Sequence, residues 1–379
     1  MTRATLPALF LSGLMAVASA RNCQNLTIPV SISARNTNFA LQAPATNIDA
    51  TNFVLNLAQP GMNYTNEVLV SSNDTNDQFR DVSGTWAIAA TYCEPDSGPG
   101  KALQVLTHGI AFDRSYWDFP AAAYNYSYVN AALARNYSTF SYDRLGLGGS
   151  SRGDPVNEVQ TALEVASLVA LTQQLRAAQV PGVAACYEKV VHVGHSYGSI
   201  QSYALTAAHA ELSDGVALTG FSLALGAFTP AFLYGGNFVQ ARESGAAALA
   251  TYPPGYLVSA DVTAAQSNFF APGNFDPAIL EAAYTTGQPV TVGELMTIGG
   301  ATAGNNTFGG PVLVITGERD IPFCGGNCLT SSPSIPAQSE KYFTNASSFD
   351  TIIVGGTGHG LNLVNLTCPL VQTILWNRN

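Results

Sequence analysis

The sequence predicts an α/β protein whose central sheet is mostly parallel and flanked by helices. Two observations support this prediction. From residue 102 onward, short apolar runs that end in Gly-bearing turns alternate with helix-like stretches. This is the pattern of parallel strands that are buried on both faces and joined by right-handed crossovers. Two earlier segments alternate apolar with polar residues instead, so we expect half-buried antiparallel strands at the start of the sheet.

The expected elements can be placed along the chain. The half-buried strands cover residues 26–34 and 84–91, and the polar segment between them, 36–81, is expected to have little regular structure of its own. The parallel strands are expected at residues 103–106, 138–142, 189–193, 216–225, 311–316 and 351–354. The clearest helix is expected to begin at Asp154, a capping residue that precedes Pro155 at the first helical position.

Residues 227–308 separate two late strands and are rich in Ala, Gly, Phe and Tyr. We predict that they form a mostly helical cap, inserted into a core that comprises residues 21–226 and 309–379. Such an insertion would lie over the strand ends, where ligands bind in open α/β sheets. An alternative stays open at this point: the segment could be a packed lobe that does not contact a substrate.

Several features predict a secreted, extracellular protein. Residues 1–20 resemble a signal peptide, because Arg3 precedes an apolar stretch and Ala18-Ser19-Ala20 provides small residues for cleavage. The apolar stretch is shorter than a bilayer span, and we expect no integral membrane segment elsewhere. Eight Asn-x-Ser/Thr sequons are candidate glycosylation sites: Asn25, Asn63, Asn73, Asn125, Asn136, Asn305, Asn345 and Asn365.

Cysteine content agrees with an oxidising compartment. The six cysteines form an even set, but six cysteines allow 15 connectivities, so only one local pair can be predicted. That pair is Cys324 with Cys328. A metal site at this pair is disfavoured, because the chain has no second closely spaced cysteine pair and few histidines.

The composition of the chain limits the kinds of partner that it can bind. Hydrophobic residues at 47% and charged residues at 11% indicate a chain with a sizeable core. The formal net charge of −10, with 15 scattered Lys and Arg residues, disfavours a nucleic-acid partner. Neither length nor composition predicts an oligomeric state.

The motif Gly194-His195-Ser196-Tyr197-Gly198 follows an apolar strand and precedes a helix-compatible stretch. A serine on such a tight turn has an exposed hydroxyl, and small flanking residues let the strand and the helix approach closely. Ser196 is therefore the candidate nucleophile. The backbone N–H of Tyr197, at the start of the helix, is a candidate donor to a negatively charged oxygen.

A serine nucleophile requires a histidine base, and the chain has only five histidines. His192 lies within a strand, His195 on the turn itself, and His209 on the following helix. His108 belongs to a separate loop, described below. His359 remains, in a Gly-rich loop after the last strand, and is the candidate base.

The third member of the site should be a carboxylate that orients the histidine. Asp320 follows the buried strand at 311–316 and is the candidate, with Glu318 as a local rival. Asp143 also follows a strand, but bracing of nearby turns is the better interpretation for it.

Thr107-His108-Gly109-Ile110 follows another strand and is expected beside Ser196. We predict that the backbone N–H of Ile110 is the second donor to the oxyanion, with a supporting role for His108. Trp117, further along, could line the pocket or belong to the core.

Five motifs in order resemble the α/β-hydrolase fold family, particularly its secreted fungal members. They are His108-Gly109, Asp143-Arg144-x-Gly-x-Gly, the Ser196 motif, Gly317-x-x-Asp320 and Gly358-His359-Gly360, and the order Ser, acid, His matches that family. The resemblance covers about residues 26–376 and implies an eight-stranded type of sheet, a serine hydrolase and no metal or cofactor. Ser199 stands where many relatives have a Gly, and the His-Gly-Gly-Gly run of some lipases is missing.

Aromatic residues of the predicted cap favour an uncharged, hydrophobic substrate, and a small-molecule or lipid-like carboxylic ester is the leading class. These residues are Phe228, Phe232, Tyr234, Phe238, Tyr252, Tyr256, Phe269, Phe270 and Phe275. Alternatives are a peptidase like the prolyl aminopeptidases, a cofactor-free haloperoxidase or perhydrolase, and a non-catalytic secreted binding protein. The peptidase would need cap carboxylates for a free amine, and the candidates are Glu243, Asp261, Asp276, Glu281 and Glu294.

Overall fold

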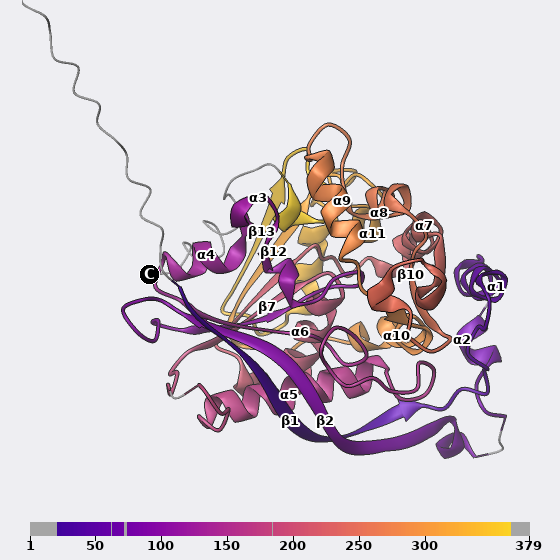
Figure 1. Ribbon diagram of the computed structural model, residues 1–379, viewed down its shortest axis with the longest axis horizontal. Helices are drawn as coiled ribbons and strands as arrows, with labels where there is room; N and C mark the ends of the chain where they lie inside the picture. The colour runs from indigo at the N-terminus through magenta and orange to yellow at the C-terminus, as the bar shows by residue number, and fades with distance from the viewer. Residues whose placement is uncertain (1–20, 62, 72–73, 184, 365–379) are drawn as a thin grey trace, which may run out of the picture.

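The computed structural model of the chain (Figure 1) describes residues 21–61, 63–71, 74–183 and 185–364, without the side chains of residues 225–228. The expected signal peptide lies outside this range. So do Asn73, Asn365 and Cys368, and the side chain of Phe228 is not described.

The central sheet has eight strands in the order β1-β2-β6-β3-β7-β8-β12-β13. The strands are β1 (Asn22–Thr37), β2 (Phe79–Glu94), β3 (Leu103–Thr107), β6 (Ser138–Tyr142), β7 (Val190–His195), β8 (Gly215–Thr219), β12 (Pro311–Gly317) and β13 (Ser348–Val354). β2 pairs antiparallel with β1 and β6, and each later pair is parallel. The predicted α/β class and the antiparallel start of the sheet are confirmed.

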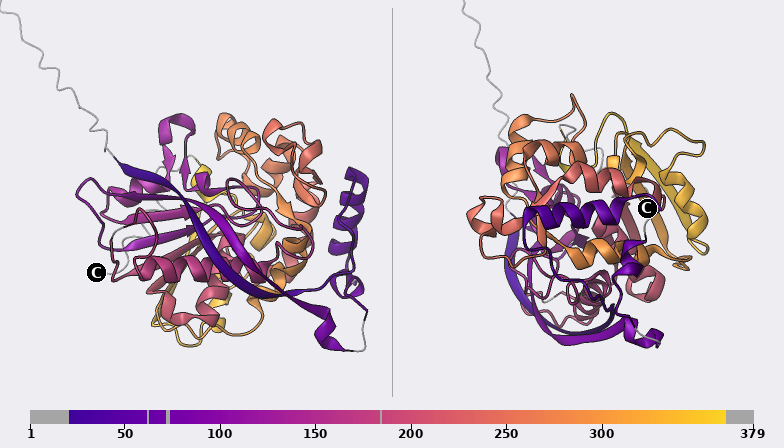
Figure 2. Two further views of the ribbon diagram at one scale, coloured as in Figure 1. Left: turned by 60° about the horizontal axis from the view of Figure 1, so that its bottom comes forward. Right: turned by 90° about the vertical axis from the view of Figure 1, so that its right-hand side faces the viewer.

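Burial follows the sequence pattern. β3, β6 and β8 are buried at every residue, as the continuous apolar runs indicate. β1 and β2 are longer than expected and curve past the rest of the sheet (Figure 2). The predicted strand 216–225 is too long: β8 ends at Thr219, because Gly220 adopts a φ of 53° and Ser222 turns away to donate its hydroxyl to the Phe323 carbonyl.

Helices cover both faces of the sheet (Figure 1), and the main ones in the core are α4 (Tyr128–Leu133), α5 (Thr161–Arg176) and α6 (Tyr197–Ala208). The predicted start at Asp154 is wrong. Asp154 caps only one turn, accepting from the amides of Val156 and Asn157. The chain then extends at Gln160, whose side-chain amide bonds the backbone of Thr37. Because of these bonds the backbone at Gln160 is extended, and α5 begins only at Thr161.

The segment between β1 and β2 is more regular than predicted. It contains α1 (Asn47–Ala58), which begins with a capping box formed by Thr46 and Asp49, followed by α2 (Tyr64–Glu67). The Thr-x-x-Asp capping-box signature at the start of α1 is the sequence signal that indicates this helix. Phe53 and Val54 of α1 share a hydrophobic cluster with Leu233, so α1 lies against the segment that precedes β12 (Figures 1 and 2).

Residues 227–308, which we call the cap, contain helices and also a small antiparallel sheet that the sequence did not predict. The elements from β8 to β12 are α7 (Leu225–Gly236), β9 (Phe238–Gln240), β10 (Tyr256–Ser259), α8 (Val262–Phe269), α9 (Pro277–Thr285), β11 (Val290–Thr291) and α10 (Val292–Thr297). Shorter elements elsewhere are β4 (Asp118–Phe119), α3 (Ala121–Tyr124), β5 (Tyr126–Ser127) and α11 (Ile321–Cys324). The division of the chain into core and cap stays a prediction.

Two disulfides are present among the described residues. Cys324 pairs with Cys328, as predicted, and Cys23 pairs with Cys93 across β1 and β2. Cys186 is exposed and has no disulfide partner among the described residues. Within the described part of the chain, no helix combines the length and apolar character that crossing a bilayer requires.

Candidate active site

The turn between β7 and α6 holds Ser196 in a strained conformation, with φ 56° and ψ −120°. Strain of this kind is common where a nucleophile must be exposed on a strand-to-helix turn. A Cβ at Gly198 would lie 2.0 Å from the Thr107 carbonyl oxygen, and one at Gly194 would lie 2.4 Å from the Gly198 carbonyl oxygen. Both positions therefore require glycine. Ser199 is accommodated, because its hydroxyl donates to the Thr219 carbonyl oxygen at 2.9 Å.

His359 and Asp320 form the second part of the site. The Nδ1–H of His359 donates to Asp320 Oδ2 at 2.5 Å, and both side chains are completely buried. The other Asp320 oxygen accepts from the Phe323 amide at 2.8 Å. His359 Nε2 is buried without a hydrogen-bond partner, so its lone pair is available for a proton.

The predicted rival carboxylate has a different task. Glu318 accepts from the amide of Gly356 at 2.9 Å and pairs with Arg319 at 3.0 Å. It therefore braces the loop that leads to His359, while Asp320 contacts the imidazole.

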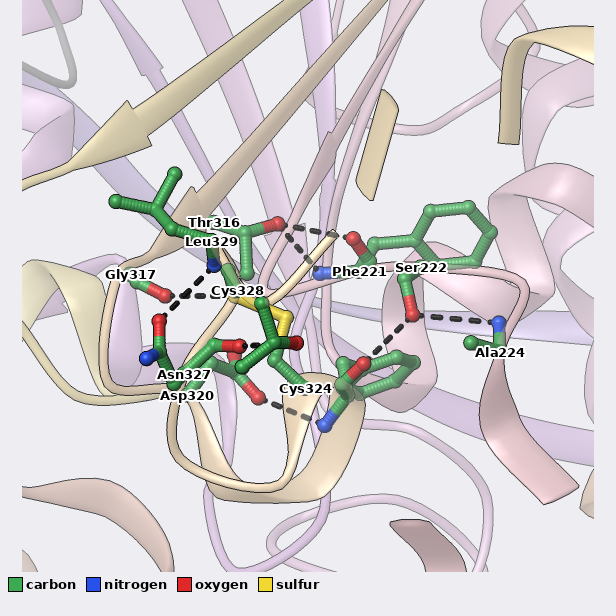
Figure 3. Close-up of a disulfide and its surroundings, with 12 residues drawn as sticks. Phe221, Ser222, Ala224, Thr316, Gly317, Asp320, Cys324, Asn327, Cys328 and Leu329 are labelled. Atoms are coloured by element: carbon green, nitrogen blue, oxygen red, sulfur yellow. Dashed lines mark hydrogen bonds between the residues drawn. A yellow bond between two sulfur atoms is a disulfide. The ribbon is translucent and has the colours of Figure 1, made fainter. Parts of the chain in front are cut away.

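The predicted disulfide lies immediately beside the acid (Figure 3). Cys324 ends the short helix that Asp320 caps, and the Cys328 amide donates to the Glu318 carbonyl at 2.9 Å. The Gly326 amide donates to the Asp320 carbonyl at 2.8 Å. Disulfide and backbone bonds together close the loop that carries Asp320.

Ser196 and His359 both adjoin the end of β8. The Ser196 amide donates to the Thr219 carbonyl, and the His359 ring lies so close to Gly220 that a Cβ there would be 2.7 Å from Cε1. No hydrogen bond joins Ser196 Oγ to His359 Nε2 in this arrangement. Catalytic hydrogen bonds are often long before substrate binds.

Aromatic rings enclose the imidazole of His359. Phe269 and Phe323 stack on it with ring centroids 5.8 and 5.5 Å away, and the ring of His195 lies at 4.8 Å. Burial, together with His359 and His108, holds the pKa of His195 well below its usual value. His195 therefore stays neutral and does not repel a proton on His359. Sequence patterns do not place either phenylalanine beside His359, because Phe269 and Phe323 lie in other segments of the chain.

Both predicted oxyanion donors adjoin the nucleophile. Ile110 and Tyr197 line the same pocket as Ser196, and Tyr197 is the first residue of α6, where the amide has no partner within the helix. Gly109 packs so closely that a Cβ there would be 2.7 Å from the Ser196 Cβ. The Ile110 backbone is thus held beside the nucleophile.

His108 supports this loop, as predicted. Its Nδ1 donates to the Gly109 carbonyl at 2.8 Å and its Nε2 accepts from the Arg144 amide at 3.2 Å. Burial and Arg144 lower the pKa of His108 well below its usual value, so it stays neutral. Asp143 braces turns, also as predicted, by accepting from the amides of Arg114 and Gly149.

The remaining predicted residues are structural. His192 is a satisfied core residue, bonded to Thr172 and Ser213, and burial lowers its pKa to about 3. His209 is partly exposed near Glu211. Trp117 is fully buried in the core rather than in the pocket.

A buried ion cluster beneath Tyr197 was not predicted. Arg144 Nη1 bonds both Glu164, at 2.7 Å, and Glu294, and all three side chains are inaccessible to solvent. The guanidinium also lies 4.6 Å from the Tyr197 ring centroid. Because Glu164 belongs to α5 and Glu294 to α10 of the cap, the cluster joins cap and core below the nucleophile.

The pocket at Ser196, which we call the nucleophile pocket, has a volume of about 50 Å³. Its walls are apolar and come mainly from the cap and α11: Phe232, Leu233, Leu295, Ile298, Pro322 and Phe323. Across the described residues, no group of three or more His, Cys, Asp or Glu side chains is arranged to hold a metal ion.

The sheet order, the strained serine turn and the His–Asp pair after late parallel strands define an α/β-hydrolase fold. The family model for the alpha/beta hydrolase family matches residues 104–372, so the chain belongs to this family. No curated protein sequence matches the chain.

Comparison with solved structures gives further similarities. The chain is similar to an enol-lactonase from Burkholderia xenovorans LB400, with 18% identity and a TM-score of 0.52, over 76% of this chain and 95% of the other. It is also similar to a thermophilic esterase from Thermogutta terrifontis, with 14% identity and a TM-score of 0.47, over 77% and 92% of the two chains. A third similar structure is Epoxide Hydrolase A from Mycobacterium thermoresistibile, with 16% identity, a TM-score of 0.47 and coverage of 76% and 94%.

Proposed function

We propose that the protein is a secreted serine hydrolase that cleaves carboxylic esters of hydrophobic substrates through an acyl-enzyme intermediate. One observation carries the proposal. A buried histidine donates to a buried carboxylate through one nitrogen and leaves the other without a partner, next to a strained serine.

In the proposed mechanism, Ser196 Oγ attacks the ester carbonyl while His359 Nε2 accepts the hydroxyl proton. Asp320 holds the imidazole in the tautomer whose Nε2 is free and stabilises its positive charge. The amides of Ile110 and Tyr197 donate to the oxyanion. His359 then protonates the departing alkoxide, and a water molecule releases the acid by the same steps in reverse order.

The apolar pocket supports an ester over the charged substrate of an aminopeptidase. The candidate carboxylates of the cap are occupied elsewhere or face solvent. Asp261 and Asp276 cap α8 and α9, Glu294 binds Arg144, Glu243 lies near Arg242, and Glu281 is exposed. None of them lines the nucleophile pocket, so an incoming ammonium group would find no counter-charge there.

Secretion remains part of the proposal. The sequon asparagines within the described residues, Asn25, Asn63, Asn125, Asn136, Asn305 and Asn345, are exposed, as glycosylation would require. Two disulfides also suit an extracellular location. Shifts in apparent mass after treatment with a glycosidase would test this point.

The decisive test compares wild-type protein with Ser196→Ala. We expect a fluorophosphonate probe to label the wild-type protein and not the variant. We also expect the wild-type protein to cleave p-nitrophenyl esters at least about 10⁴-fold faster than the variant. Circular dichroism would show that both are folded. Preference for prolyl nitroanilides would favour the peptidase, and a requirement for halide and peroxide would favour the haloperoxidase. Failure of both labelling and turnover would favour a binding protein.

A further inference from the structure

A second cavity lies in the cap and is much larger than the nucleophile pocket. Its volume is about 380 Å³, and we call it the cap cavity. Its inner end is formed by Ala111 and Phe112, which directly follow Ile110 of the nucleophile pocket. Successive Cα atoms are about 3.8 Å apart, so one stretch of chain forms a wall of both spaces.

The lining of the cap cavity is small, aromatic and uncharged. Alanines at several positions leave space that larger side chains would fill, and rings of Phe and Tyr form walls. The alanines within the cap are Ala246, Ala247, Ala248, Ala265 and Ala283. No Asp, Glu, Lys, Arg or His is among its described lining residues. Such a cavity favours a bulky, uncharged, apolar group, because a charge would lose its hydration without gaining a partner.

Several polar side chains at the cavity are already bonded to nearby backbone. Thr285 donates to the Glu281 carbonyl at 2.9 Å, and Ser244 donates to the Ala241 carbonyl at 2.7 Å. Gln288 accepts from the Gly148 amide at 3.3 Å. These contacts leave apolar surface as the main feature that a ligand meets.

One aromatic ring connects the cap cavity with the catalytic base. Phe269 lines the cavity and stacks on His359, and Phe112 packs against Phe269 with ring centroids 5.1 Å apart. His359 protonates the leaving alcohol, so the group attached to that oxygen departs next to His359. The cap cavity therefore reaches His359 through Phe269, as the nucleophile pocket does through Phe323, and of these two spaces it is the one large enough for a bulky leaving group.

The nucleophile pocket sets the size of the other half of the substrate. It contains Ser196 and both oxyanion donors, so the acyl carbonyl must lie there. An apolar cavity of about 150 Å³ holds one benzene molecule, whereas this pocket has about 50 Å³. On that scale the pocket has room for a short acyl group of about two carbons.

From this division we infer that the substrates are short-acyl esters of bulky apolar alcohols, with the aromatic or alicyclic alcohol in the cap cavity and the acyl group at Ser196. The inference rests on the proposed ester hydrolysis and specifies its substrate class. It assigns different halves of the ester to two spaces of very different volume.

The test uses Ala283→Phe, which places a ring in the cap cavity from α9. The matched control is Ala278→Phe, at an exposed position of the same helix that does not line the cavity. We expect Ala283→Phe to raise KM for 2-naphthyl acetate about tenfold or more, with ethyl acetate hydrolysis and the control variant within about twofold of wild type. Ala265→Leu, from α8, provides a second filled cavity if Ala283→Phe does not fold.

Wild-type specificity gives an independent readout. We expect kcat/KM to fall about tenfold or more when 2-naphthyl acetate is replaced by 2-naphthyl octanoate. Equal effects of the two Phe variants, or a preference for ethyl esters of long or bulky acids, would overturn the assignment of the two spaces. Hydrolysis of ethyl acetate and labelling of Ser196 would still occur in that case, whereas their absence would reject the proposed function itself.

Discussion

The nucleophile turn and the His359 loop meet at one site but are held in different ways. Ser196 is fixed within the sheet: the backbones of its strand and helix touch at Gly194, and Gly198 packs directly on Thr107 of β3. His359 instead depends on distant segments. The Gly360 amide donates to the Phe269 carbonyl at 2.8 Å, and Asn274 of the cap donates to the Gly356 carbonyl at 3.1 Å.

This difference separates global stability from local positioning. Substitutions at the nucleophile turn should disturb the sheet, because Thr107 of the adjacent central strand β3 contacts it directly. Substitutions in the His359 region should disturb catalysis first, because loops can shift without loss of the sheet. Four predictions follow from the comparison.

The largest effect on stability is expected for Gly198→Ala. The new methyl group would lie 2.0 Å from a backbone oxygen of β3, which cannot move without breaking the sheet. We expect a loss of about 4 kcal/mol or more in the free energy of unfolding, measured by chemical denaturation. Ser199→Ala, at the next residue, is the control and should cost only about 1 kcal/mol. Normal stability of Gly198→Ala would contradict the close packing described for this turn.

Asp320→Asn should affect catalysis far more than folding. An amide cannot accept the Nδ1–H in the same way and favours the wrong tautomer of His359, so kcat should fall about 10⁴-fold. Glu318→Gln is the matched control, because Glu318 bonds only backbone and Arg319. Its kcat should stay within about tenfold of wild type. Similar losses in both variants would mean that Asp320 does not orient the base.

The two disulfides provide an internal contrast. Cys324 and Cys328 are 4 residues apart beside Asp320, whereas Cys23 and Cys93 are 70 residues apart in the sheet. On the chain-entropy relation, loss of the first should cost about 2 kcal/mol and loss of the second about 4 kcal/mol.

Activity should follow the opposite order. Cys324→Ser with Cys328→Ser should lower kcat about tenfold, because a displacement of about 1 Å at the acid is costly. Cys23→Ser with Cys93→Ser should leave kcat unchanged in the protein that remains folded. Steady-state kinetics and thermal unfolding of both double variants would show whether the two effects separate.

The smallest effect is expected at the ion cluster below the nucleophile turn. Burial raises the pKa of the Glu164 carboxyl well above the usual value of 4.5 for a glutamate, although Arg144 opposes this. The folded state then binds more protons than the unfolded state above pH 4.5. The free energy of unfolding contributed by this group therefore falls as pH rises from there towards the folded-state pKa.

Glu164→Gln removes this titration and keeps a hydrogen-bonding group beside Arg144. As pH rises from 5 to 8, the free energy of unfolding should decrease less in the variant than in the wild type. We expect the two decreases to differ by on the order of 1 kcal/mol. Denaturation at several pH values would measure this. A variant with the wild-type pH dependence would show that Glu164 is charged throughout that range.

Local patterns explain why much of the site could be predicted. The strand, turn and helix around Ser196 are continuous in sequence over residues 190–208. Asp320 and His359 follow strands whose ends meet at one edge of the sheet. The support for these residues could not be predicted. Phe269 stacks on His359 across 90 positions of sequence, and Glu294 reaches Arg144 from the cap. Likewise, the predicted helix start at Asp154 was wrong because Gln160 bonds a strand more than one hundred residues away in the sequence.

The position of α1 limits how this enzyme can be recombined with its relatives. Its side chains Phe53 and Val54 come from the beginning of the chain but pack with Leu233 and Phe238 of the cap. A chimera that exchanges residues 227–308 alone would pack one side of α1 against side chains of a different protein. A chimera that takes its substrate specificity from a relative should therefore exchange residues 38–70 together with the cap. The exchanged unit then consists of two separate stretches of sequence.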